Sequence, residues 1–135
     1  MPSAMLTAPA SRTALRAGRI LTALAILFLL TDGLGKVFKV APIMEACARS
    51  GVPERFVPGL GVVLIVATLI YAIPRTSALG AIVLTGYFGG ATWAHVRLGD
   101  PVLVVLFPGL LGALIWGGVY LREPRLRALI PVRQD

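Results

Sequence analysis

The sequence predicts an all-α integral membrane protein: a four-helix bundle of up-down topology, with a short interfacial helix between spans one and two. Apolar residues make up 57% of the 135 residues and charged residues 14%, whereas soluble domains average about 45–50% and about 25%. Four windows of roughly 20 mostly apolar residues match the thickness of a bilayer. The windows lack the period-2 alternation of strands, which favours helices.

The first span is predicted over residues 20–40, and the second over residues 56–73, where Pro74 stops the helix. The third span covers residues 77–96, with Thr76 or Ser77 as its N-cap. Only a few residues separate spans two, three and four, so neighbouring spans are expected to be antiparallel.

The fourth span covers residues 101–121, with Asp100 as N-cap and Pro101 at the first helical position. The bundle thus occupies residues 20–121. Residues 1–19 are expected to form a disordered cytoplasmic tail, and residues 122–135 a basic cytoplasmic tail.

The connection between spans one and two contains a predicted helix over residues 42–50, with Pro42 at its start and Gly51 after its end. Ile43, Met44 and Cys47 share one side, which we expect to face the membrane. Cys47 is interpreted as a small apolar filler. A single cysteine excludes a disulfide scaffold, a Cys-rich zinc site and an internal dithiol pair.

Orientation follows from the basic residues, because cytoplasmic flanks carry the excess of Lys and Arg. Eight flank one side of the bundle: Arg12, Arg16, Arg19, Arg75, Arg122, Arg125, Arg127 and Arg133. Five flank the other: Lys36, Lys39, Arg49, Arg55 and Arg97. Both termini are therefore predicted to be cytoplasmic. The net charge of +7 lies at span ends and not on a soluble face, so the expected partner is the lipid bilayer and not nucleic acid.

Small residues at a spacing of four predict flat helix-packing faces. Span three offers Gly86, Gly90 and Ala94, and span four offers Gly109, Ala113 and Gly117. We expect these faces to pack within one chain, with a homodimer seam as the alternative. Aromatic residues expected near the cytoplasmic interface are Tyr71, Trp116 and Tyr120.

Ionisable residues inside apolar spans are the candidate functional residues. Asp32 and Lys36 lie four apart on span one, in the better helical order for an ion pair. Lys36 can snorkel outward, whereas Asp32 lies deeper and needs a partner. His95, at the outer end of span three, is expected to converge with both. The alternatives stay open: the pair is a structural staple or a functional site, and His95 bonds a loop carbonyl or carries protons. The ligands are too few for zinc, so no metal is expected.

Several segments resemble the DoxX-like family of small bacterial four-helix membrane proteins: TDGLGK (31–36), SGVP (50–53), IPRT (73–76), LGAIVLTGYFGGATWAHVRLGDP (79–101) and WGGVYLREPRLRALIP (116–131). The family's polar motif matches Asp32, Gly33 and Lys36, and His95 matches the position at the end of the third helix. Members often carry a glutamate after the Leu-Gly pair of the second helix. Here Leu60-Gly61 precedes VVLIVATLI without an acid, which leaves Asp32 as the acid within a span.

The resemblance implies a bacterial plasma-membrane protein and an accessory subunit of a membrane redox system. A non-covalently bound quinone would enter near Tyr87, Trp93 and His95. The alternatives are a non-enzymatic assembly or partner protein, and a proton or small-solute permease using Asp32, Lys36 and His95. The sequence identifies no catalytic residue and no cofactor ligand, and the chain is not expected to catalyse electron transfer alone.

Overall fold

In the computed structural model, which describes residues 9–130, all the regular elements are helices. In chain order they are α1 (Arg12–Val37), α2 (Ala41–Arg49), the 3-10 turn η1 (Glu54–Phe56), α3 (Val57–Ala72), α4 (Ser77–Leu98), α5 (Val102–Arg122) and α6 (Pro124–Leu129). The all-α prediction is confirmed for these residues. Residues 1–8 of the expected amino-terminal tail, and residues 131–135 with Arg133, lie outside the described range.

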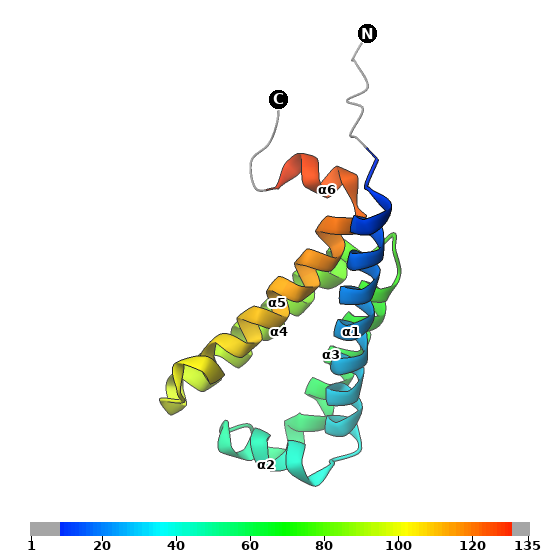
Figure 1. The fold of residues 1–135 in the computed structure, drawn as a ribbon. Coiled ribbons are helices and arrows are strands. Elements are labelled where there is room, and N and C mark those ends of the chain that lie inside the picture. Colours follow the sequence, from blue (N-terminus) through cyan, green and yellow to red (C-terminus); the bar gives the residue numbers. More distant parts are fainter. Residues whose placement is uncertain (1–8, 131–135) are drawn as a thin grey trace.

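The four long helices pack in a ring. α1 packs on α3 and α5, and α4 completes the ring by packing on the same two helices. Figure 1 shows α4 and α5 diverging from α1 and α3 toward the end that α2 crosses, while α6 crosses the other end beside the start of α1. We call these the α2 end and the α6 end. The ring is therefore tighter at the α6 end.

Three of the described helical segments are long and apolar enough to cross a membrane: α1, the continuous segment Glu54–Ala72, and α5. α4 has 22 residues, but its glycines and the polar residues Thr85, Thr92 and His95 lower its apolar content, and it is not among the three. The finding supports a membrane protein whose long helices are largely apolar.

The first helix begins earlier than predicted. α1 starts at Arg12 because the Ser11 hydroxyl oxygen accepts a hydrogen bond from the backbone N–H of Ala14, at 3.1 Å. The added turns pack on α5, since a Cβ at Gly18 would lie 2.6 Å from Cγ of Arg122. Residues 12–19 are thus helical, and the expectation of a disordered tail is wrong for them.

The predicted N-cap of α5 is wrong, whereas α4 has its N-cap at Thr76, one of the two residues predicted. The N-cap of α5 is Pro101, and the Asp100 carboxylate contacts His95 instead. Thr76 holds the N-cap position of α4, but its hydroxyl donates to the carbonyl oxygen of Ile70, at 2.7 Å, because the tight α3–α4 turn brings that acceptor closer. The α2 prediction was accurate: the helix ends at Arg49, and Gly51 follows with φ +73°.

Tyr71 forms the centre of the core at the α6 end. Its side chain is fully buried, so the expectation of an interfacial ring is wrong. Its hydroxyl donates to the carbonyl oxygen of Ile115 at 3.0 Å and lies 3.4 Å from the Thr22 hydroxyl. The core therefore joins α1, α3 and α5 through one phenol, with apolar side chains around it: Ala25, Leu29, Leu64, Ala67, Ala81, Leu84, Phe88, Ile115 and Val119.

Three of the six small residues predicted to pack within the chain face open space instead. A Cβ at Gly86, Gly90 or Gly109 would have no neighbour within 4 Å. Leu84 and Phe88 are the buried residues of this part of α4. Gly86 and Gly90 each follow one of them by two positions, about 200° around the helix. Ala113 is exposed, Ala94 is half-buried, and Gly117 has only a methyl of Leu21 nearby, at 3.8 Å.

Close helix contacts occur at other glycines. A Cβ at Gly61 would lie 2.7 Å from the carbonyl oxygen of Gly33, where α1 and α3 cross, and one at Gly118 would lie 2.6 Å from the Thr22 hydroxyl. At Gly80, the backbone of Tyr71 occupies the space that a Cβ would need. Contacts between helices therefore decide which glycines are needed for close packing. The spacing of glycines along one helix does not.

Gly80→Ala should destabilise the fold by about 1–3 kcal/mol, because the added methyl overlaps the backbone of α3. Gly86→Ala is the matched control in the same helix, and we expect it to be neutral or to stabilise by up to about 1 kcal/mol through helix propensity. Reversible unfolding in detergent micelles measures both variants. Equal effects of the two substitutions would contradict the packing described.

Candidate functional site

The site is built around an ion pair within α1. The Lys36 ammonium contacts the Asp32 carboxylate one helical turn earlier. The Lys36 residue is only 8% exposed, and the Asp32 side chain is partly buried. An acid four residues before a base is the favourable order for such a pair in a helix. The sequence spacing therefore leads directly to the observed contact.

Glycines let the neighbouring helices close around this pair. A Cβ at Gly61 of α3 would lie 2.8 Å from Cβ of Lys36, and a Cβ at Gly35 would overlap Ile43 of α2. Both neighbours therefore lie against the α1 backbone beside Lys36. This packing explains why Lys36 is the more buried partner of the pair. The sequence had suggested that Lys36 would snorkel to the surface, and it does not.

Two further side chains are candidates for the site. Cys47 is buried on the inner side of α2, where burial raises the pKa of its thiol, Lys36 lowers that pKa and Asp32 raises it. Tyr87 of α4 is half-buried beside Phe88 of the core, with the two ring centroids 6.1 Å apart. We call Asp32, Lys36, Cys47 and Tyr87 the Asp32 cluster. Cys47 was not among the predicted site residues, and its signal was its place on the inner side of α2.

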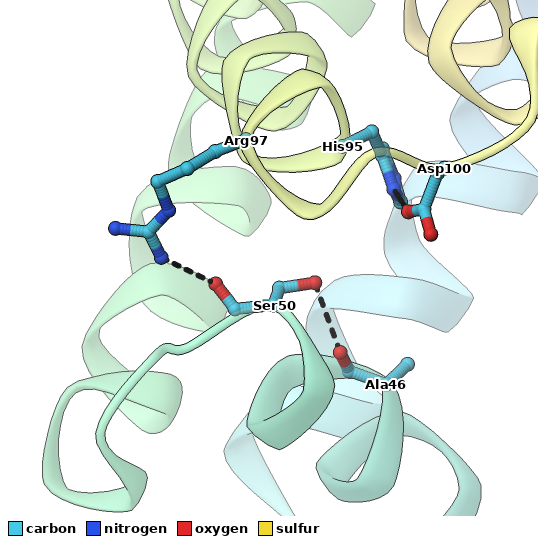
Figure 2. A network of polar contacts seen from close by, with 5 residues as sticks. All are labelled: Ala46, Ser50, His95, Arg97 and Asp100. Carbon is cyan, nitrogen blue, oxygen red and sulfur yellow. Dashed lines mark hydrogen bonds and ion pairs between the residues drawn. The ribbon is translucent and has the colours of Figure 1, made fainter.

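The predicted convergence of His95 with Asp32 and Lys36 is not observed. The His95 ring nitrogen Nδ1 lies 2.6 Å from the Asp100 carboxylate, in the turn between α4 and α5 (Figure 2). The hydrogen-bond partner of His95 is therefore a carboxylate, whereas one of the two expected alternatives was a loop carbonyl. Toward its carboxyl end, α4 diverges from α1 (Figure 1). Trp93, at 66% exposure, faces away from the core.

Arg97 provides a link that the sequence did not indicate. Its guanidinium donates to the carbonyl oxygen of Ser50, at 3.1 Å, and so joins the end of α4 to the end of α2 (Figure 2). A side chain at Gly51 would occupy the space of this guanidinium, because a Cβ there would lie 2.6 Å from its nitrogen Nη2. The link holds α2 across the α2 end, over the Asp32 cluster.

The cluster offers hydrogen-bond donors in an apolar setting. A lysine ammonium has three N–H donors, and Asp32 accepts one of them. The Tyr87 hydroxyl is a further donor and acceptor. Among the described residues, no group of three or more His, Cys, Asp and Glu side chains is placed to hold a metal ion. The arrangement suits a molecule with carbonyl or hydroxyl groups.

The comparisons with known proteins agree with the helical, membrane-type sequence. The model of the DoxX-like family matches residues 20–118, which include the Asp32 cluster and His95. No curated protein and no solved structure matches the chain. Since the family match covers most of the sequence, the chain belongs to the DoxX-like family.

Proposed function

We propose that this chain crosses the bacterial plasma membrane four times, as an up-down bundle with both termini in the cytoplasm. Three helices are apolar enough to span. α4, with 22 residues, reaches about 33 Å and packs between α3 and α5. Arginines at the α6 end outnumber the basic residues at the α2 end in the sequence, which supports a cytoplasmic α6 end.

The same proposal assigns a function to the α2 end: the chain binds a quinone-like molecule there, as an accessory subunit of a membrane redox system. The observation that carries it is the burial of Lys36, a cation with unused donors inside an apolar assembly. Intramembrane charges are rare and mark functional sites more often than not. A quinone carbonyl oxygen is an acceptor of the kind that Lys36 and Tyr87 would bind.

Apolar surface beside the cluster supports a ligand with a hydrophobic tail. The buried residues of α4 end at Phe88, and those of α5 begin at Pro108. Between them, both helices carry large apolar side chains that the chain leaves exposed, among them Val96, Val102, Leu103, Leu106 and Phe107. A quinone ring and its isoprenoid tail would cover such side chains while the polar ring edge faces Lys36.

Three residues of the cluster then have defined roles. Asp32 keeps Lys36 charged and oriented, Lys36 and Tyr87 donate to the ligand oxygens, and α2 covers the site through the Arg97 link. With one cysteine the chain has no dithiol of its own, so the proposed role is to bind the quinone for a partner that supplies the electrons.

Lys36→Met should weaken the binding of a short-chain ubiquinone or menaquinone analogue by about 10- to 100-fold, because a charge-assisted hydrogen bond is lost. Tyr87→Phe, which keeps the ring, should weaken it less. Lys39→Met is the matched control, since this lysine is exposed and pairs with Glu54 at 3.0 Å. Titration of each variant in lipid nanodiscs measures the affinity, and circular dichroism checks the fold. Absence of binding by the unmodified chain, or equal losses at both lysines, would refute the assignment.

The second candidate function is an assembly or partner protein that docks on another membrane protein, or on a second copy of this chain. The specific observation is the outward glycine face of α4, where Gly86 and Gly90 meet nothing within 4 Å. Glycine faces allow close helix approach in lipid. This face would then meet a helix from outside the chain.

Gly90→Leu should abolish co-purification of such a partner or a crosslinked homodimer, because the larger side chain keeps the helices apart. Gly59→Leu is the control, since Gly59 of α3 also faces open space. Crosslinking in native membranes, followed by gel and mass analysis, measures both variants. A partner retained equally by the two variants would exclude this face as the contact.

A further inference from the structure

Two arginines from separate segments meet at the α6 end. Arg75, in the turn between α3 and α4, and Arg122, in the last turn of α5, line one hollow of about 170 Å³ together with Ser77 and Glu123. The Glu123 carboxylate already accepts a hydrogen bond from the backbone N–H of Arg125, at 3.2 Å. The hollow is therefore lined by two arginines and one glutamate.

The Arg122 side chain is held in place, but within residues 9–130 not all of its hydrogen-bond donors have a partner. Its stem lies against Gly18 of α1, and its Nε donates to the carbonyl oxygen of Gly118, at 3.0 Å. Its Nη2 is buried and, within residues 9–130, has no hydrogen-bond partner. Two guanidinium nitrogens of Arg127, on α6, are buried in the same unpartnered way. A buried donor on a charged group is costly to leave unpaired, so an acceptor from outside the chain would stabilise this end.

The surrounding charge selects an anion. Arg12, Arg16, Arg19 and Arg125 also belong to this end, while Glu123 is the acidic residue that the described part of the chain carries there. A phosphodiester offers several oxygen acceptors to the planar forks of two guanidinium groups. A headgroup that also carries an ammonium would be repelled by the same arginines.

An apolar hollow borders the same turns of α5. It measures about 280 Å³ and is lined by Trp116, Gly117, Tyr120, Leu126 and Ile130. α6 supplies Leu126 to its lining. A molecule with a phosphate and a hydrocarbon chain would match both the charged hollow and its apolar neighbour.

We propose that the α6 end binds one anionic phospholipid of the phosphatidylglycerol type, with its phosphate between Arg75 and Arg122 and an acyl chain along the apolar hollow. The lipid completes the hydrogen bonding of Arg122 and fixes the crossing of α6 over the bundle. The site lies at the opposite end from the Asp32 cluster, and it is independent of the quinone proposal.

The test is native mass spectrometry of the full chain from nanodiscs that contain equal amounts of phosphatidylglycerol and phosphatidylcholine. The unmodified chain should retain one phosphatidylglycerol. Arg75→Gln should lower retention about fivefold, because the contact of its guanidinium with the lipid phosphate is lost. Arg75 is exposed, so this substitution leaves the packing intact. Arg122→Lys keeps the charge and stem but loses the fork, and should lower retention as well.

Arg16→Gln is the matched control, because Arg16 is an exposed arginine of the same end that lines neither hollow. It should leave retention unchanged. Equal losses in Arg16→Gln and Arg75→Gln, or equal retention of the two lipids by the unmodified chain, would overturn the proposal. Displacement of the lipid by millimolar inorganic phosphate would also overturn it, since the ligand would then be a free anion.

Discussion

Lys36 brings a positive charge into an assembly of apolar helices, and the Asp32 carboxylate one turn away is what allows it to stay there. Removing either partner would leave the other charge buried and uncompensated. The glycines around the pair, at 33, 35 and 61, let α2 and α3 approach α1 closely enough to bury it. The arrangement of three helices at the α2 end thus depends on one contact within a single helix.

The two ends of the molecule differ in how completely their side chains pack against, and hydrogen-bond with, other parts of the chain. At the α6 end of the ring, Tyr71 bonds the backbone of α5 and contacts Thr22 of α1, inside a continuous apolar core. At the α2 end the core stops, and α4 with α5 diverges from the other two helices (Figure 1). The proposed ligand site near Asp32 therefore lies at the end where the apolar core stops and fewer side chains are needed to hold the helices together.

The sequence predicted the features that depend on neighbours along the chain. The limits of α3, α4 and α5 came from apolar windows and from Pro74, α2 from Pro42 and Gly51, and the ion pair from a spacing of four residues. The errors arose where distant segments compete. Asp100 was expected to cap α5, but His95 reaches it across the turn. The glycine face of α4 had the right spacing, yet only the position of α3 and α5 decides which face is covered.

A double-mutant cycle on Asp32→Asn and Lys36→Met, measured by unfolding in detergent micelles, tests the account most directly. The buried pair predicts a coupling energy of about 2 kcal/mol, because the double variant removes the uncompensated charge that each single variant leaves. The same cycle on the exposed pair Lys39 and Glu54 should give less than about 1 kcal/mol. Effects at Asp32 and Lys36 that add to within about 0.5 kcal/mol would contradict the account.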